Sequence, residues 1–156
     1  MVKTSFGILL FKRSKDQIFV LLAHPGGPFW ADKDLWTLPK GEPSTSDSDG
    51  YATARREFSE ETGLPPPEGD EFIDLGELAQ SSVKINHIFA AAGDPDLSYF
   101  SSNTFELEWP PKSGTKKSFV EIDKIEWFDT DIARTKLFPK QREFIDRLEG
   151  SLNGRQ

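Results

Sequence analysis

The feature that most constrains the fold is one helical segment, residues 50–62, which carries an apolar face and an acidic face side by side. The segment ends at Gly63 and is followed by three prolines at 65–67, a common way for a helix to terminate. At about 100° per residue, four of its less polar side chains gather on one side and require a surface to cover. These side chains are Tyr51, Ala54, Phe58 and Thr62. The helix is therefore predicted to pack on a sheet through this face.

The acidic face carries Glu57, Glu60 and Glu61, whose i, i+3, i+4 spacing places them close together. Like charges at this spacing destabilise a helix by about 0.2–0.5 kcal/mol per pair when no cation is present. One interpretation is a solvated acidic face on which Arg56 pairs with Glu60. The other is a Mg²⁺ site, because this ion prefers hard oxygen ligands. A sharp break at residues 38–41 can turn a backbone carbonyl toward the same place.

Segments rich in β-forming residues surround this helix on both sides. The predicted strands are Thr4–Lys12, Gln17–Ala23, Leu35–Leu38, Phe72–Gln80, Val83–Ala92, Thr104–Trp109 and Ile125–Phe128. The predicted loops are 24–30, 42–49, 93–103 and 110–117, and the further predicted helices are Asp129–Leu137 and Lys140–Leu152. We expect a single α/β domain over residues 1–156, in which a central mixed β-sheet has helices on both faces.

Composition narrows the range of functions. The chain has no cysteine, which excludes disulfides, thiolate catalysis and cysteine-bound metals. Its net charge of −7 argues against a nucleic-acid duplex as a partner, although an acidic protein can bind small phosphates through divalent cations. The two histidines, His24 and His87, lack metal-ligand spacing and are interpreted as structural or peripheral. No apolar run approaches the roughly 20 residues that span a bilayer, so we expect a cytoplasmic protein without a membrane partner.

The run Arg56-Glu57-Phe58-Ser59-Glu60-Glu61-Thr62-Gly63-Leu64, with Gly41 upstream, resembles the Nudix box. That family's pattern is Gly, five residues, Glu, seven residues, then Arg-Glu-U-x-Glu-Glu-x-Gly-U, where U is bulky and apolar. The second half matches at every specified position. The first half has one extra residue, and the family's glutamate falls on Asp47 or Ser48, depending on the direction of counting. We expect this departure to affect the loop more than the metal site.

The resemblance implies an α/β/α sandwich fold and an activity. The activity is hydrolysis of a phosphoanhydride bond in a nucleoside-diphosphate-linked substrate by metal-activated water. Mg²⁺ is the implied cofactor, with Mn²⁺ as a possible replacement. Arg56 would orient a glutamate through a charge-assisted hydrogen bond. The implied metal ligands are Glu57, Glu60, Glu61 and the backbone carbonyl of Gly41 or Lys40.

Glu121 is a candidate for the same site from outside the box. It lies six residues before Trp127, a spacing at which several Nudix enzymes place a further metal-binding or basic glutamate. Asp123 and Glu126 are rivals for this role, and an ordinary loop carboxylate is the alternative. Either Glu61 or Glu121 is the predicted general base, and the sequence leaves the choice open.

Three residues are candidates for binding the substrate. Phe29 and Trp30 lie in a loop of Gly and Pro, where an aromatic ring either stacks on a base or packs at the rim of the core. Lys40 directly precedes the box glycine. The lysines of the 110–117 loop either steer a polyphosphate or are simply solvated.

Two functions from different classes fit the sequence. A hydrolase of nucleoside triphosphates or dinucleoside polyphosphates is favoured, because residues 36–42 resemble the Nudix branch that acts on dinucleoside polyphosphates and diphosphoinositol phosphates. The alternative is a non-catalytic nucleotide-sensing or regulatory module. The complete set of three glutamates favours catalysis on a small-molecule nucleotide. The sequence gives no indication of the oligomeric state.

Overall fold

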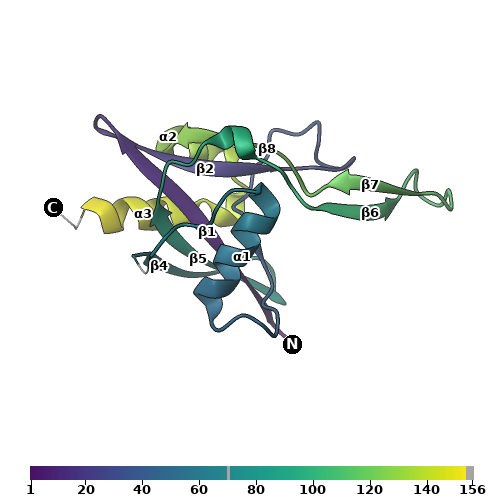
Figure 1. Ribbon diagram of the computed structural model, residues 1–156, viewed down its shortest axis with the longest axis horizontal. Coiled ribbons are helices and arrows are strands. Elements are labelled where there is room, and N and C mark those ends of the chain that lie inside the picture. The colour runs from purple at the N-terminus through teal and green to yellow at the C-terminus, as the bar shows by residue number, and fades with distance from the viewer. Residues whose placement is uncertain (70, 154–156) are drawn as a thin grey trace.

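A computed structural model describes residues 1–69 and 71–153 and has a six-stranded mixed sheet at its centre (Figure 1). The strand order is β4-β5-β1-β2-β8, with the short β3 paired to β1. The β1–β5 pair is parallel and the other pairs are antiparallel. The bounds are β1 Lys3–Ser14, β2 Gln17–Pro25, β3 Lys40–Gly41, β4 Ile73–Ala79, β5 Lys84–Ala92 and β8 Ile122–Asp129.

Helices cover both faces of this sheet, as predicted (Figure 1). Alternate residues of β1 face opposite sides, so that Ile8 contributes to one apolar cluster and Leu9 to the other. The first cluster is covered by α1 and the second by α2 and α3. The helices are α1 Gly50–Thr62, α2 Thr130–Lys136 and α3 Glu143–Asn153, with short 3₁₀ turns at Leu97–Tyr99 and Pro139–Gln141.

Helix α1 has the boundaries and the buried face that the sequence predicts. Asp49 caps its first turn by accepting a 2.8 Å hydrogen bond from the backbone N–H of Ala52. Gly63 ends the helix in the left-handed conformation, with φ of 71°. Ala54 and Phe58 are buried against the sheet. The apolar face therefore fixes the side on which the glutamates of this helix lie.

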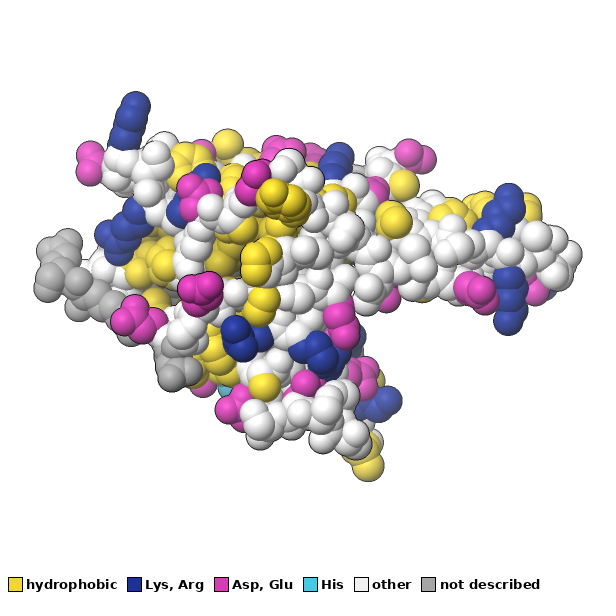
Figure 2. Space-filling model, viewed as in Figure 1, with side chains coloured by type: hydrophobic (Ala, Val, Ile, Leu, Met, Phe, Trp, Pro, Cys, Tyr) yellow, Lys and Arg dark blue, Asp and Glu magenta, His cyan; other side chains and the backbone are white. Residues whose placement is uncertain are grey.

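Strands β6 and β7 form a separate two-stranded arm that projects from the body (Figure 1). They span Thr104–Glu108 and Lys116–Val120, and Phe105 pairs with Phe119 across them. The body-side end of the arm is near Gly27, where an added Cβ would touch the Phe105 ring. Figure 2 shows charged side chains of both signs on the arm. No described helix is long and apolar enough to cross a membrane.

Two sequence predictions about local structure are wrong. Residues 35–38 form only isolated bridges, because the Trp36 N–H donates to Lys136 and the Leu38 N–H donates to the Gln141 side chain instead of to a neighbouring strand. The 110–117 segment is not wholly a loop, because β7 begins at Lys116. The first three residues of β7, Lys116 to Ser118, are polar and exposed, so they give no apolar alternation from which a strand could be predicted.

Candidate active site

Asp47 anchors the loop before α1 to the helix. Its carboxylate accepts from Nε and Nη2 of Arg56 at 3.1 and 2.9 Å, from the Ser44 N–H at 2.9 Å and from the Thr53 hydroxyl at 2.9 Å. The Arg56 guanidinium beside it holds the Asp47 pKa well below its usual range. Asp47 thus supports the loop at one of the two positions where the box pattern places its first glutamate.

Arg56 also contacts two glutamates of the acidic face. Its Nη1 donates to Glu57 at 2.9 Å and to Glu60 at 3.0 Å, so the guanidinium contacts both carboxylates. The Glu60 side chain is 42% exposed and that of Glu57 is 17% exposed. A Cβ on Gly41 would clash with the Glu57 carboxylate. Glycine at this position therefore lets the backbone lie directly against a candidate ligand.

Glu61 is the most deeply buried carboxylate of the helix, with only 8% of its surface exposed. The pKa of its carboxyl is raised to about 8, mainly by burial; the charges of Glu57 and Glu121 also raise it, and the charge of Lys40 opposes them. The half-buried Lys40 has a pKa lowered by burial, which the charges of Glu61 and Glu57 oppose. Glu57, Glu61, Glu121 and Lys40 are thus close enough to perturb one another electrostatically.

Glu121 lies between β7 and β8, where the chain passes from the arm to the main sheet. Its side chain lines a pocket that Glu61 and Lys40 also line. Of the three carboxylates considered near Trp127, Glu121 is the one in this pocket, whereas Asp123 binds His24. The structure thus brings Glu121 to the acidic helix from 60 residues further along the chain.

The pocket has a volume of about 470 Å³ and combines charged, polar and aromatic walls. Trp30 lines it and packs edge-on against Phe138, at 5.2 Å between ring centroids. Phe29 is not among the lining residues; it is 55% exposed and packs against Trp109 of the arm. The lining residues that the sequence did not single out are Pro25, Thr37, Gln80, Lys84, Ile122, Phe138 and Gln141.

His24 links the loop that carries Trp30 to the segment that follows Glu121 through contacts of its two ring nitrogens. The ring is 1% exposed; its Nδ1 lies 2.8 Å from Asp123 and its Nε2 contacts the Lys33 carbonyl. A carbonyl oxygen only accepts hydrogen bonds, so Nε2 carries a proton. These contacts agree with the interpretation of His24 as a structural residue.

The candidate metal ligands lie close together, but they do not form a complete coordination shell. Within residues 1–69 and 71–153, no three acidic or histidine side chains already converge on one metal position. Arg56 binds both Glu57 and Glu60, while Glu57 also lies against Gly41. Glu61 is close to Lys40. The donors nevertheless suit a hard divalent cation, because Mg²⁺ prefers carboxylate and carbonyl oxygens as ligands.

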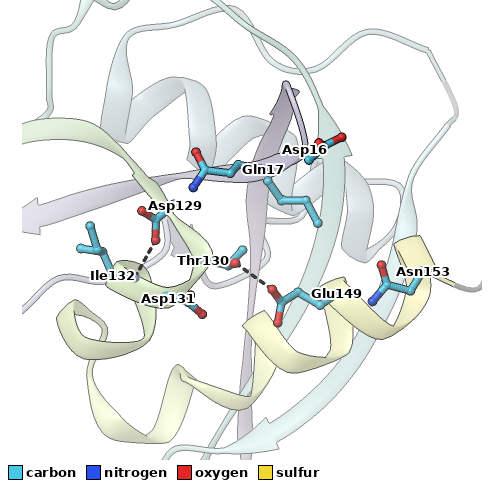
Figure 3. A pocket seen from close by; sticks show the side chains of 9 residues that line it. Asp16, Gln17, Asp129, Thr130, Asp131, Ile132, Glu149 and Asn153 are labelled. Atoms are coloured by element: carbon cyan, nitrogen blue, oxygen red, sulfur yellow. Dashed lines mark hydrogen bonds between the residues drawn. The ribbon is translucent and has the colours of Figure 1, made fainter.

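A second pocket, lined by the β1–β2 turn and by helices α2 and α3, is also acidic (Figure 3). Three of its carboxylates, those of Asp129, Asp131 and Glu149, have protein partners. Asp129 caps α2 through the Ile132 N–H, and Glu149 accepts from the Thr130 hydroxyl. Arg134 also binds Glu149. Helix capping, ion pairing and a hydroxyl hydrogen bond thus account for these three acidic groups.

The burial of Glu61 predicts a pH-dependent change in stability. In the metal-free protein, folded Glu61 keeps its proton up to a pH of about 8, whereas the unfolded group releases it near 4.5. Unfolding therefore releases a proton between these values, and the stability that Glu61 contributes below pH 4.5 is lost as the pH rises toward 8. Since glutamine does not titrate, Glu61→Gln is expected to melt higher than the wild type, with a gap that widens over this interval.

Melting temperatures in a chelator, from pH 5 to pH 9, measure this gap. The exposed Glu71→Gln serves as the control and is expected to follow the wild type. A gap for Glu61→Gln that stays constant with pH would contradict the inferred burial of a neutral carboxyl.

Comparisons with known proteins identify the family and the fold of the chain. The NUDIX domain family model matches residues 1–148. No curated protein matches significantly. Among solved structures, the NUDIX domain of Shewanella oneidensis NrtR bound to ADP ribose is 17% identical with a TM-score of 0.65, covering 97% of this chain and 89% of that one.

Two further solved structures share the fold. A C. elegans Ap4A hydrolase binary complex is 15% identical with a TM-score of 0.64, covering 96% of this chain and 98% of that one. A mutT/nudix family protein from Listeria innocua is 15% identical with a TM-score of 0.61, covering 98% and 95%. At these identities the likeness establishes the fold alone. The family model spans nearly the whole chain, and on that ground the protein belongs to the Nudix family.

Proposed function

We propose that the protein hydrolyses a phosphoanhydride bond in a nucleoside-diphosphate-linked substrate with the help of a divalent cation. The observation that carries the proposal is that Glu61, Glu121 and Lys40 line one pocket. Glu57, from the same helix as Glu61, lies against Gly41. Acid–base groups with strongly perturbed pKa values in a pocket are typical of catalytic sites. Membership of the Nudix family supports hydrolysis as the reaction.

Glu57, Glu60, Glu61 and the Gly41 carbonyl would hold Mg²⁺ or Mn²⁺. Such an ion, when bound, neutralises phosphate charge and makes a water molecule more acidic. Glu61 or Glu121 would accept the proton of the attacking water. The water oxygen forms a bond to phosphorus, the bridging P–O bond breaks, and the leaving phosphate takes the electron pair. Arg56 keeps Glu57 and Glu60 oriented through its Nη1.

The pocket walls support a nucleotide as the substrate. Lys40 and Lys84 offer positive charge to phosphates, and Trp30 offers an aromatic face to a base. We favour nucleoside triphosphates or dinucleoside polyphosphates. The solved relatives include an Ap4A hydrolase and a domain bound to ADP ribose, which supports nucleotide binding by this fold.

One observation favours a nucleotide-binding module without turnover. Within the described residues the carboxylates do not converge on one metal position, and Arg56 binds two of them. A protein that shares this fold, Shewanella oneidensis NrtR, has been solved in complex with a 27mer DNA, and this chain covers 63% of that chain. A sensing domain would bind the nucleotide and leave it intact.

A product-release assay separates the two functions. The protein is incubated with nucleoside triphosphates, dinucleoside polyphosphates, ADP ribose and nucleotide sugars, in Mg²⁺ or in a chelator. The hydrolase predicts Mg²⁺-dependent products from at least one class, at nanomolar enzyme. Calorimetric binding of a nucleotide without any product would instead establish the sensing module.

Trp30 and Phe29 are adjacent aromatics that provide a matched pair for testing base stacking. Trp30→Ala is expected to raise the KM about tenfold, because base–aromatic stacking is worth about 1–3 kcal/mol, while kcat changes little. Phe29→Ala is expected to leave the KM near that of the wild type, because its ring contacts Trp109 outside the pocket. Steady-state kinetics on the preferred substrate measures both. Equal effects of the two substitutions would remove Trp30 from the binding site.

A further inference from the structure

The backbone at Glu121 is held by loops on either side. Its N–H donates to the Asn103 carbonyl at 2.8 Å, and its own carbonyl accepts from the Gly26 N–H at 2.8 Å. Glu121 itself belongs to neither β7 nor β8. The direction of its side chain therefore depends on these loop contacts.

The half-buried Ser102 joins two of the groups around this residue. Its Oγ accepts from the Ile122 N–H at 3.0 Å and donates to the Asn103 carbonyl at 3.0 Å. That carbonyl is the same acceptor that the Glu121 N–H uses. The hydroxyl thus closes a ring of hydrogen bonds around the peptide that links Glu121 to Ile122.

The segment 101–103 also forms hydrogen bonds with helix α1, which carries Glu61. The Ser101 N–H donates to the Thr62 carbonyl at 2.9 Å, and the Asn103 N–H donates to the Glu60 carbonyl at 3.2 Å. These are carbonyls of the last turn of α1, which lack partners within the helix. A Cβ on Gly63 would clash with Ser101, so the segment lies directly against the helix end.

We propose that Ser102 is a positioning residue that fixes Glu121 relative to Glu61. The hydrogen bonds run without interruption from the turn of α1 that carries Glu61, through residues 101–103, to the peptide of Glu121. Ser102 provides the side-chain link in this path. The two carboxylates come from distant parts of the chain, and this link sets their separation across the pocket. The catalytic consequence rests on the proposed function, whereas the geometric one does not.

A purely stabilising role for Ser102 predicts a different outcome. In that case, loss of the hydroxyl would lower the melting temperature but leave Glu121 in place in the molecules that stay folded. A positioning role moves the carboxylate at temperatures well below melting. A displacement of about 1 Å can reduce a rate by about 10²-fold.

Three variants test the proposal through crystal structures and steady-state kinetics. Ser102→Ala removes the hydroxyl, Ser102→Thr retains it, and Ser101→Ala removes the neighbouring hydroxyl as a matched control. We expect Ser102→Ala to displace the Glu121 carboxylate from its wild-type position relative to Glu61 and to lower kcat about 10–100-fold with little change in KM. Ser102→Thr is expected to restore both the position and kcat, and Ser101→Ala to match the wild type. If Ser102→Ala does not fold, Ser102→Cys replaces it, since sulfur bonds weakly in a similar volume.

A Glu121 carboxylate that stays in place without the Ser102 hydroxyl would overturn the proposal, whatever the activity. Equal losses of kcat in Ser102→Ala and Ser102→Thr would also overturn it, because the hydroxyl would then not be the cause. If the wild type hydrolyses no substrate but Ser102→Ala displaces Glu121, the proposed function fails and the positioning role stands.

Discussion

Glu61→Gln is expected to lose about 10²–10⁴-fold in turnover while keeping the fold, because positioned acid–base groups typically contribute this much. The substitution removes one negative charge and barely changes the volume of an 8% exposed side chain. Loss of metal affinity would deepen the defect, since an anionic ligand is also lost. Initial rates at saturating Mg²⁺, together with melting temperatures in chelator, measure the effect. The expected combination is low turnover with an equal or higher melting temperature.

Two further variants, Glu60→Gln and Glu71→Gln, are compared with Glu61→Gln. Glu60→Gln is expected to lower turnover in the same way, because the resemblance implies it as a ligand, even though Arg56 binds it here. Glu71→Gln, an exposed glutamate outside the site, is expected to retain wild-type rates. Near-wild-type turnover in both Glu60→Gln and Glu61→Gln would show that the acidic helix is not catalytic, and the sensing module would then be the better account.

Phe58→Ala is expected to lower the free energy of unfolding by about 3–5 kcal/mol, because it leaves a cavity between α1 and the sheet. Phe58 is 1% exposed and packs in the cluster that contains Ile8, Leu21 and Leu64. Small domains have total stabilities of about 5–15 kcal/mol, so this one ring accounts for a large share. Equilibrium unfolding in urea measures the change.

The control for this prediction is Tyr99→Ala, since Tyr99 is 71% exposed. Exposed substitutions of this kind usually change stability by less than about 0.5 kcal/mol. A loss below about 1 kcal/mol for Phe58→Ala would mean that the helix is not anchored through its apolar face.

The parts of the site that the sequence predicts are those set by local geometry. A helix places Glu57, Glu60 and Glu61 on one face whatever the rest of the fold, and the caps at Asp49 and Gly63 fix its ends. The buried apolar side of the same helix predicts a sheet beneath it. This is why the mixed α/β sandwich follows from the pattern.

The remainder of the pocket depends on contacts between distant segments. Lys84 reaches it because β5 pairs in parallel with β1, and Phe138 reaches it from beyond α2. No periodicity in the sequence encodes that register. The role of Ser102 could not be predicted from the sequence for the same reason, since its hydrogen-bond partners are the backbone groups of Asn103 and Ile122.

The error at residues 35–38 has a related cause. Trp36 and Leu38 are buried and apolar, as in a strand, but their backbone groups bind the segment around α2 and the Gln141 side chain. The expectation of a single domain over residues 1–156 remains a prediction, as do the individual roles of the site residues.

Hydrolysis of the preferred substrate in H₂¹⁸O tests the central claim most directly. The account predicts that each bond cleaved in Mg²⁺ places one ¹⁸O atom on a phosphate group of one product, because water attacks phosphorus. Mass spectrometry of the products locates the label. Absence of any product across the nucleotide panel, or cleavage that leaves the phosphate groups unlabelled, would contradict it.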